Sequence, residues 1–258
     1  MAVHDVAARG FGDRAEQYEQ ARPSYAADAV AWLVAQLGIG PGATVCDLAA
    51  GTGKLTRLLV PAGGLLLAVE PVEGMRTVLH RALPAVPAAA AVAEALPFAD
   101  GALDAVTVAQ AFHWFDAAAS LTELHRALRA GGRLGLLWNA WDDSKSWIDR
   151  VHKVVADAGA TDNWKRGHWS RDWVVEAIDA HGGYSPVTRA QFTNGQPLSR
   201  EGVVERVATT SHIASATAES RERTLVAVRE ILETDPDTRD LDTLDFSYVV
   251  DAFWCERR

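Results

Sequence analysis

The chain has 258 residues, of which 48% are apolar and 23% are charged, a composition typical of a globular protein that buries a sizeable core. The formal net charge of −9 argues against a polyphosphate partner, since nucleic-acid binders normally present a basic face. We therefore expect a small-molecule substrate and no nucleic-acid partner. The first residues lack the pattern of a signal peptide, and no apolar run approaches ~20 residues, so we expect a cytoplasmic protein outside the membrane.

The cysteines and histidines give no metal-ligand pattern. Cys46 and Cys255 are the only cysteines, and each falls in an expected strand, where a packed small hydrophobic residue is more typical than a disulfide or metal pair. His113 and His125 are not spaced as zinc ligands with either cysteine. We therefore expect no bound metal.

Residues 4–25 form a polar segment with regularly spaced aromatic side chains. These are seven positions apart: Phe11, Tyr18 and Tyr25. The spacing fits one face of a short helix lying on the domain. A further helix is expected to begin after Ser24, its N-cap, and to end in the glycine-rich stretch 38–42.

Residues 43–56 predict a ligand site at the end of a buried strand. The strand closes on Asp47, a turn of small residues follows, and a helix is expected from about Gly53. Gly51 and Gly53 allow backbone N–H groups to approach a ligand without an intervening Cβ. The N-terminus of the helix would point at the same place and favour a negatively charged group there.

Two common nucleotide motifs do not fit this turn. A dinucleotide fingerprint requires a third glycine where Thr56 stands. A P-loop lysine must follow a glycine and precede serine or threonine, whereas Lys54 precedes Leu55.

Later strands carry further candidates at their ends. An expected strand over 63–70 ends at Glu70, where a doubly wound fold places an acid on the ribose hydroxyls. A weak strand over 88–92 follows, and the strand over 103–109 should direct Gln110 and His113 toward the cleft.

The elements up to residue 139 alternate between strand and helix, which predicts a parallel sheet with right-handed crossovers. Asp116 should cap a helix that ends at Gly131 and Gly132, before a fifth strand over 133–139. Helices near 145–158 and 171–181 follow, then strand-like segments at 187–193 and 244–254 with helices near 199–209 and 218–233 between them.

Tryptophans concentrate where this alternation breaks. Seven of the nine, from Trp114 to Trp173, lie between the fourth strand and the end of an insertion over 140–185. We expect this insertion to be a helical cap that forms the wall of a substrate pocket. The expected wall residues are Trp114, Trp141 and Trp147.

The sequence from Asp47 to Gly53 resembles the D-x-G-x-G-x-G signature of class I S-adenosylmethionine-dependent methyltransferases, with Ala49 in place of the first glycine. Together with Gln-Ala-Phe-His-Trp-Phe at 110–115, it is most similar to a small-molecule branch that includes the trans-aconitate methyltransferases. The resemblance covers 11–139 by motifs. It implies a Rossmann-like, doubly wound, seven-stranded α/β sheet, mostly parallel with an antiparallel last strand, in a single domain over 1–258.

The resemblance also implies roles for individual residues. Residues 4–25 would be a leader that folds over S-adenosylmethionine through Tyr18 and Arg22. An apolar side chain at Met75, after Pro71, would pack on the adenine. The loop of Ala93, Glu94 and Ala95 would receive the adenine edge.

The implied reaction is transfer of the cofactor's methyl group to a small acceptor through O-, N- or carboxyl methylation. His113 would lie nearest the methyl group and act as general base for a hydroxyl or amine acceptor, since a pKa near ~6.5 suits that task. Alternatively, His113 hydrogen-bonds to a backbone carbonyl and only shapes the pocket. Two other functions stay open: a non-catalytic S-adenosylmethionine sensor or scaffold, and an NAD-dependent reductase, which the missing third glycine disfavours.

Overall fold

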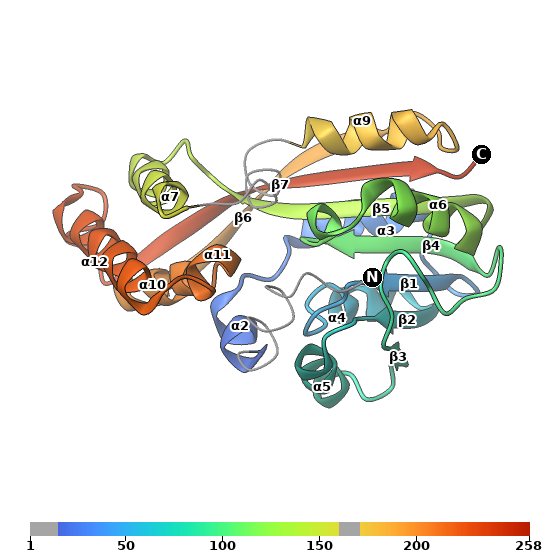
Figure 1. The fold of residues 1–258 in the computed structure, drawn as a ribbon, viewed down its shortest axis with the longest axis horizontal. Helices are drawn as coiled ribbons and strands as arrows, with labels where there is room; N and C mark the ends of the chain where they lie inside the picture. Colours follow the sequence, from blue (N-terminus) through green and yellow to red (C-terminus); the bar gives the residue numbers. More distant parts are fainter. Residues whose placement is uncertain (1–14, 160–170) are drawn as a thin grey trace.

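The computed structural model describes residues 15–159 and 171–258, in which helices surround one sheet (Figure 1). The seven strands are β1 (Thr44–Leu48), β2 (Leu65–Val69), β3 (Ala88–Ala89), β4 (Leu103–Ala109), β5 (Leu128–Trp141), β6 (Thr188–Ser199) and β7 (Thr243–Glu256). The helices of the first part are α2 (Ala15–Ala21), α3 (Ala27–Leu37), α4 (Thr56–Leu59), η1 (Val60–Ala62), α5 (Glu73–Ala82), η2 (Phe112–Trp114) and α6 (Ala117–Ala127). The later helices are α7 (Ser146–Asp157), α9 (Asp172–His181), α10 (Arg200–Ala208), α11 (Ser211–Ala214) and α12 (Ala218–Thr234).

The strand order is β3-β2-β1-β4-β5-β7-β6, so the chain winds outward from β1 in both directions. β1 to β5 pair in parallel, and β7 lies antiparallel between β5 and β6. The expected doubly wound, seven-stranded sheet with an antiparallel last strand is confirmed. The switch in winding direction between β1 and β4 is where open α/β sheets bind ligands, at the carboxyl ends of the strands.

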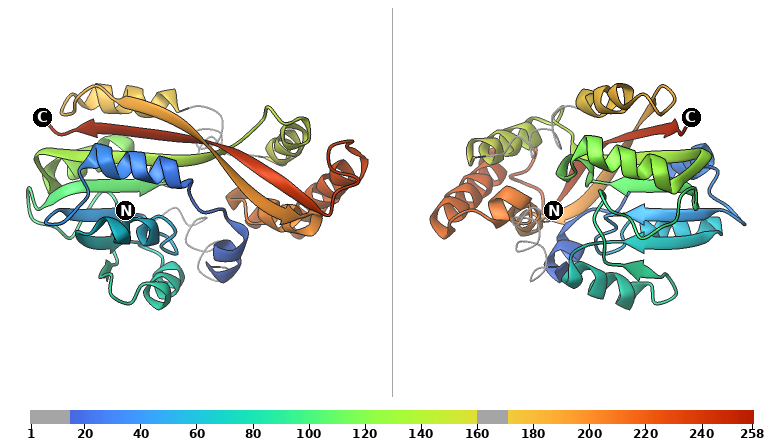
Figure 2. Two further views of the ribbon diagram at one scale, coloured as in Figure 1. Left: turned by 180° about the vertical axis from the view of Figure 1, so that it is seen from behind. Right: turned by 45° about the vertical axis from the view of Figure 1, so that its right-hand side comes forward.

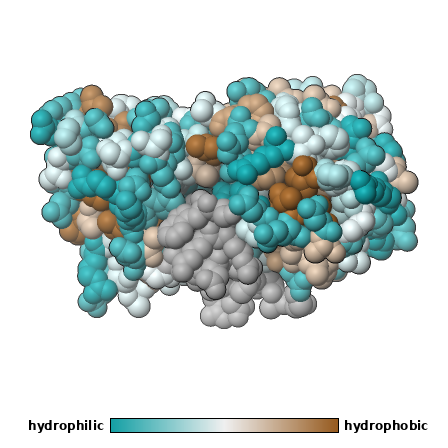
Figure 3. All heavy atoms as spheres, turned by 90° about the horizontal axis from the view of Figure 1, so that it is seen from above, coloured by the Kyte–Doolittle hydropathy of each residue, from teal (hydrophilic) through white to brown (hydrophobic). Residues whose placement is uncertain are grey.

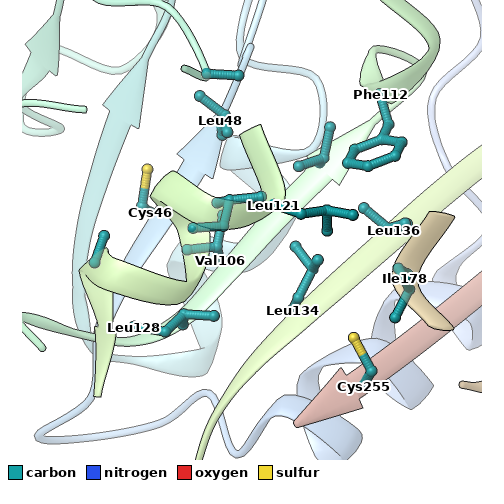
Figure 4. Packing of buried hydrophobic residues seen from close by; sticks show 14 of the residues in the cluster. Cys46, Leu48, Val106, Phe112, Leu121, Leu128, Leu134, Leu136, Ile178 and Cys255 are labelled. Atoms are coloured by element: carbon teal, nitrogen blue, oxygen red, sulfur yellow. The ribbon is translucent and has the colours of Figure 1, made fainter. Parts of the chain in front are cut away.

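One face of the sheet packs against α6 and α9 through a cluster of buried apolar side chains (Figure 4). Cys46 from β1 and Cys255 from β7 both point into this cluster and are unpaired thiols. Burial raises the pKa of Cys255 to about 12, and that of Cys46 well above its usual value. The interpretation of both cysteines as packed hydrophobic residues is confirmed.

The opposite face is covered by α3, whose Leu33 and Leu37 are buried over β5. α3 and β5 approach closely at Gly135, because a Cβ built there would lie 2.6 Å from Cδ1 of Leu37. Two expected details differ. Ser24 does not cap α3, because this helix starts after Ala26. Gly131 does not end α6 but lies within β5, because β5 follows α6 directly at Leu128.

β5, β6 and β7 are longer than the other strands and extend past them at one end (Figure 2). These ends carry a helical lobe, which comprises α7, α10, α11, α12 and the adjoining ends of β5, β6 and β7. The helices expected together in a cap over 140–185 separate here. α7 packs with α10 and α12, whereas α9 packs on the sheet beside α6. The short α2 touches both α10 of this lobe and α5 beside the sheet.

Over the described residues, no helix is both long enough and apolar enough to cross a membrane. On the face that Figure 3 shows, hydrophobic residues gather only in small, separate patches among polar ones.

We predict that Gly135→Ala lowers the free energy of unfolding by about 1–3 kcal/mol, because the new methyl group would overpack the contact with α3. Gly40→Ala is the matched control, since a Cβ there would have no neighbour within 4 Å. Urea unfolding measures both variants. Equal effects at the two positions would contradict close packing at Gly135.

Candidate cofactor and acceptor site

Asp47 lies at the carboxyl end of β1, beside the change in winding direction, and is only 1% exposed. Its two carboxylate oxygens accept hydrogen bonds from Oγ1 of Thr56 at 2.6 Å and of Thr107 at 2.8 Å. Burial raises the pKa of Asp47 to about 6, although these hydroxyls act in the opposite direction. The Asp47 carboxylate is thus held in a fixed orientation at the end of β1, at the cost of removing its charge from water.

Glu70 provides a second buried carboxylate directly after β2. Its oxygens accept from the backbone N–H groups of Gly51 and Val72, both at 2.9 Å. Burial raises its pKa, whereas these two bonds and the positive charge of Arg76 lower it in part. The Arg76 guanidinium donates to the carbonyls of Glu70 and Pro71. Among the described residues, neither Asp47 nor Glu70 belongs to an ion pair.

Alternate residues of the turn after β1 have a left-handed backbone conformation. Ala49, Gly51 and Gly53 have φ values of 53°, 58° and 84°. A Cβ on Gly51 would meet nothing within 4 Å, so open space adjoins this position. A Cβ on Gly53 would lie 3.2 Å from Cγ of Leu79, so a larger residue here would crowd α5, and the φ of 84° also favours glycine.

The helix after the turn is shorter and later than expected. α4 begins at Thr56 rather than near Gly53, and only four residues are helical before η1. The expected negatively charged group at a helix N-terminus is therefore not supported, since a single helical turn has only a weak dipole.

A cavity of about 40 Å³ adjoins the turn, between Asp47 and the segment around α2. Its lining residues are Tyr18, Tyr25, Asp47, Ala49, Ala50, Gly51, Thr52, Lys54, Leu55 and Ala109. α2 is held over it by Glu19, whose carboxylate accepts from Oγ1 of Thr52 at 2.5 Å and pairs with Arg57 at 2.8 Å. Tyr18 thus lies beside the turn, as expected.

Arg22, expected beside Tyr18, is directed toward the helical lobe. Its Nη2 donates to the carbonyl oxygen of Thr209, at the end of α10, at 2.6 Å. Its guanidinium lies 5.1 Å from the centre of the Tyr18 ring.

The other expected cofactor residues follow β2 and β3. Pro71 is half-buried, and Met75 is buried in α5. Ala93 is buried, whereas Ala95 is exposed and its N–H donates to Val92. Glu94 accepts from the backbone N–H of Asp116 at 2.8 Å, next to the start of α6. Asp116 itself caps α6 as predicted, accepting from Ala119 N.

Gln110 ends β4 with a left-handed φ of 59°. Its Nε2 donates to the carbonyl oxygen of Asn139 at 3.0 Å, and Nδ2 of Asn139 donates to the carbonyl oxygen of Ser24. The amide side chains thus join the carboxyl ends of β4 and β5 to the segment between α2 and α3.

His113 lies in η2, directly after β4. Its Nδ1 accepts a long hydrogen bond of 3.5 Å from Nε1 of Trp138, which leaves the proton on Nε2. Burial and the charges of Arg171 and Arg22 lower its pKa to about 3. The expected pKa near 6.5 is wrong, and at neutral pH the ring is a hydrogen-bond donor rather than an effective general base.

The three tryptophans expected in a pocket wall lie in different surroundings. Trp114 is half-buried, with its ring 5.1 Å from that of His113. Trp141 and Trp147 are 3% and 5% exposed and pack edge-on against Phe246 in the core of the helical lobe. None of the three tryptophans lines the cavity beside Asp47.

Sequence reasoning missed the residues that support the turn. Thr107 faces Asp47 across the β1–β4 pair, and a hydroxyl residue within the apolar run that follows Asp104 in the strand 103–109 was a usable signal. Glu19 and Thr52 gave no such signal, because their contact joins segments far apart in the sequence.

A doubly wound sheet with a turn of small residues at the end of β1 and an acid at the end of β2 is typical of Rossmann-like enzymes that bind a nucleotide cofactor. A family model described as "Methyltransferase domain" matches residues 46–136. An uncharacterised methyltransferase of Mycobacterium tuberculosis is 36% identical over 241 residues, which cover 93% of this chain and 92% of that protein. The chain therefore belongs to the methyltransferase family and is an S-adenosylmethionine-dependent methyltransferase.

Solved structures agree on the fold. A putative methyltransferase from an antibiotic biosynthesis pathway of Anabaena variabilis has a TM-score of 0.63 at 21% identity, covering 90% of this chain and 98% of its own. Geranyl diphosphate C-methyltransferase of Streptomyces coelicolor, in complex with S-adenosyl-L-homocysteine, has a TM-score of 0.57 at 13% identity, covering 100% and 99%.

We predict that Ala49→Gly raises the free energy of unfolding by about 0.5–1 kcal/mol, since it removes left-handed strain and loses part of that gain to chain entropy. Ala50→Gly is the matched control, because Ala50 does not have a positive φ. It should lower the free energy of unfolding. Chemical denaturation compares the two, and destabilisation by Ala49→Gly as large as that by Ala50→Gly would contradict the strain.

Proposed function

We propose that the enzyme methylates a small organic acceptor, with S-adenosylmethionine held at the carboxyl ends of β1 and β2. The observation that carries this proposal is the pair of buried carboxylates, Asp47 and Glu70, which lack an ion-pair partner in the described part of the chain. Buried charges need compensation, and a cofactor with an ammonium and a sulfonium supplies it. The pyrophosphate of a dinucleotide would add repulsion instead.

The residues around the turn fit such a cofactor. Open space at Gly51 and the left-handed turn at Ala49 allow the ligand to approach the backbone. Glu70 keeps acceptor capacity for ribose hydroxyls, since each of its oxygens receives one N–H bond and can accept more. Tyr18 would cover the ligand, while Asp47 supplies negative charge through a medium of low dielectric constant.

More distant contacts of the cofactor complete the proposed site. Pro71 and Met75 would pack on the adenine, and the loop of Ala93, Glu94 and Ala95 would meet its edge. Gln110 would stabilise the end of β4 beside it through its bond to Asn139. Gly53 contributes through its packing on α5.

When bound, S-adenosylmethionine supplies an electrophilic methyl group on a sulfonium. The acceptor's nucleophilic atom forms the new bond to this carbon as the carbon–sulfur bond breaks, and the electron pair stays on sulfur. The protein's contribution is to orient the acceptor and exclude water, for which about 7–11 kcal/mol is available in favourable cases. His113, with a pKa of about 3, would donate a hydrogen bond to the acceptor, and a hydroxyl or amine acceptor would lose its proton to bulk water when the methylated product leaves the site.

We infer that the acceptor is small for two reasons. The net charge of −9 disfavours nucleic acid. The half-buried Trp114 beside His113 offers an aromatic surface suited to an organic molecule. Membership of the trans-aconitate methyltransferase branch is a hypothesis that rests on the motifs at 47–53 and 110–115 alone.

We predict that binding of S-adenosylhomocysteine weakens as pH falls through 6. The pKa of free Asp47 is about 6, and a bound ammonium lowers it, so affinity is full above pH 6 and is lost as the carboxylate is protonated. Between pH 7 and pH 5 the dissociation constant should rise about tenfold. Isothermal titration calorimetry measures it, and Asp47→Asn should remove most of this dependence. An equal dependence in both proteins would contradict the role of Asp47.

We predict that methyl groups from labelled S-adenosylmethionine enter small metabolites. The purified enzyme is incubated with a cell extract separated into low-mass, protein and RNA fractions, and radioactivity is counted in each. Enzyme without extract and Asp47→Asn protein are the controls. Preferential labelling of the protein or RNA fraction would contradict a small acceptor.

A further inference from the structure

Two arginines meet between α2 and the helical lobe. Arg206 in α10 is 2% exposed, and Arg22 follows α2. Arg22 donates to the backbone carbonyl of Thr209, three residues after Arg206 at the end of α10. Arg206 is close enough to lower the pKa of Arg22, which burial and this second charge together bring to about 10.

Aromatic side chains surround the pair. The guanidinium of Arg206 lies 5.5 Å from the centre of the Trp141 ring and 5.7 Å from that of Tyr248. Nε of Arg206 donates to the hydroxyl of Tyr248 at 3.0 Å. The rings hold the guanidinium in a fixed orientation.

Both arginines keep a buried N–H group without an acceptor. Nη1 of Arg206 and Nε of Arg22 have no hydrogen-bond partner, and neither residue forms an ion pair within residues 15–159 and 171–258. The ring faces and the carbonyls at the end of α10 offset part of the two charges, but they supply no acceptor to these two atoms. Adjacent buried cations of this kind are costly unless an anion neutralises them.

This pair lies beside the cofactor site. Tyr18 lines the cavity at Asp47 and also packs under the Arg22 guanidinium. Arg22 is also near enough to His113 for its charge to contribute to lowering the pKa of that ring, which carries its proton on Nε2. A molecule that extends from the two arginines toward the cavity would therefore meet the Nε2–H donor of His113 and the aromatic ring of Tyr18.

We propose that Arg22 and Arg206 bind an anionic group, a carboxylate or a phosphate, of the methyl acceptor. The proposal rests on the function proposed above and adds the chemical class of the acceptor: a small organic anion. The anion anchors the acceptor through charge-assisted hydrogen bonds to the two guanidiniums, and a different atom of the acceptor accepts the methyl group. Arg22 thus belongs to the acceptor site rather than to the expected cofactor contacts.

Thermal unfolding with added anions tests this assignment. The probes are benzoate, inorganic phosphate and the uncharged benzamide, each at matched ionic strength and with saturating S-adenosylhomocysteine. Benzoate or phosphate should raise the melting temperature saturably, whereas benzamide should not. A stronger effect of benzoate indicates a carboxylate acceptor, and a stronger effect of phosphate indicates a phosphorylated one.

Three variants locate the effect. Arg206→Met should raise the dissociation constant of the effective anion at least about tenfold, as expected for loss of a charged hydrogen-bond donor. Arg206→Lys, which keeps the charge without the planar fork, should show a smaller loss and serves if the methionine variant does not fold. Arg223→Met, at an exposed position on α12, changes net charge equally and should leave anion binding unchanged.

The outcomes separate the two proposals. No stabilisation by either anion, or equal stabilisation of wild type and both Arg206 variants, would overturn the anion site. Loss of S-adenosylhomocysteine affinity in the Arg206 variants would also overturn it, because these arginines would then belong to the cofactor site. Failure of the wild type to bind S-adenosylhomocysteine would instead refute the proposed cofactor site.

Discussion

The site depends on two carboxylates buried at the ends of neighbouring parallel strands. Asp47 is fixed by the hydroxyls of Thr56 and Thr107, and Glu70 by two backbone N–H groups. These hydrogen bonds orient the oxygens but do not fully offset the cost of burying their charge, because burial raises the pKa of both groups more than the bonds lower it. The surrounding sheet supplies the low-dielectric medium in which this negative charge acts strongly on a cationic ligand.

The sheet also brings the proposed acceptor-binding half of the site close to the two carboxylates. β5, β6 and β7 extend beyond β1 to β4 and carry the helical lobe (Figure 2). Arg206 belongs to α10 of this lobe. α2 touches α10 on one side and α5 on the other. One segment of the chain therefore contacts both the acidic cofactor turn, through Glu19, and the basic end of α10, through Arg22. Negative charge at the strand ends and positive charge on the lobe define opposite ends of the proposed site.

Local sequence patterns predicted the strands well because apolar runs bounded by turn residues specify them. The strand over 103–109 was predicted with the bounds observed for β4, whereas the alanine-rich strand at 88–92 shrank to two residues. The helices of 140–185 were also recognised. Their separation into two clusters was not, since long-range packing decides which face each helix covers.

In the candidate site, too, the features set by local sequence were predictable and those set by long-range packing were not. The turn from Asp47 to Gly53 and the acid at Glu70 follow from spacing along the chain. The lowered pKa of His113 does not, because it arises first from burial and then from the charges of Arg171 and Arg22, all of which depend on the folded chain. Tryptophan content indicated burial for Trp141 but could not distinguish a pocket wall from a packed core beside Arg206.

The central claim is that buried negative charge at Asp47 selects a cationic cofactor. It is tested most directly by comparing S-adenosylhomocysteine, which carries an ammonium, with 5′-methylthioadenosine, which carries none, on wild type and Asp47→Asn by calorimetry at pH 7.5. The account predicts that Asp47→Asn weakens binding of S-adenosylhomocysteine about tenfold or more and leaves 5′-methylthioadenosine unchanged. Equal loss for both ligands, or no loss for either, would contradict it.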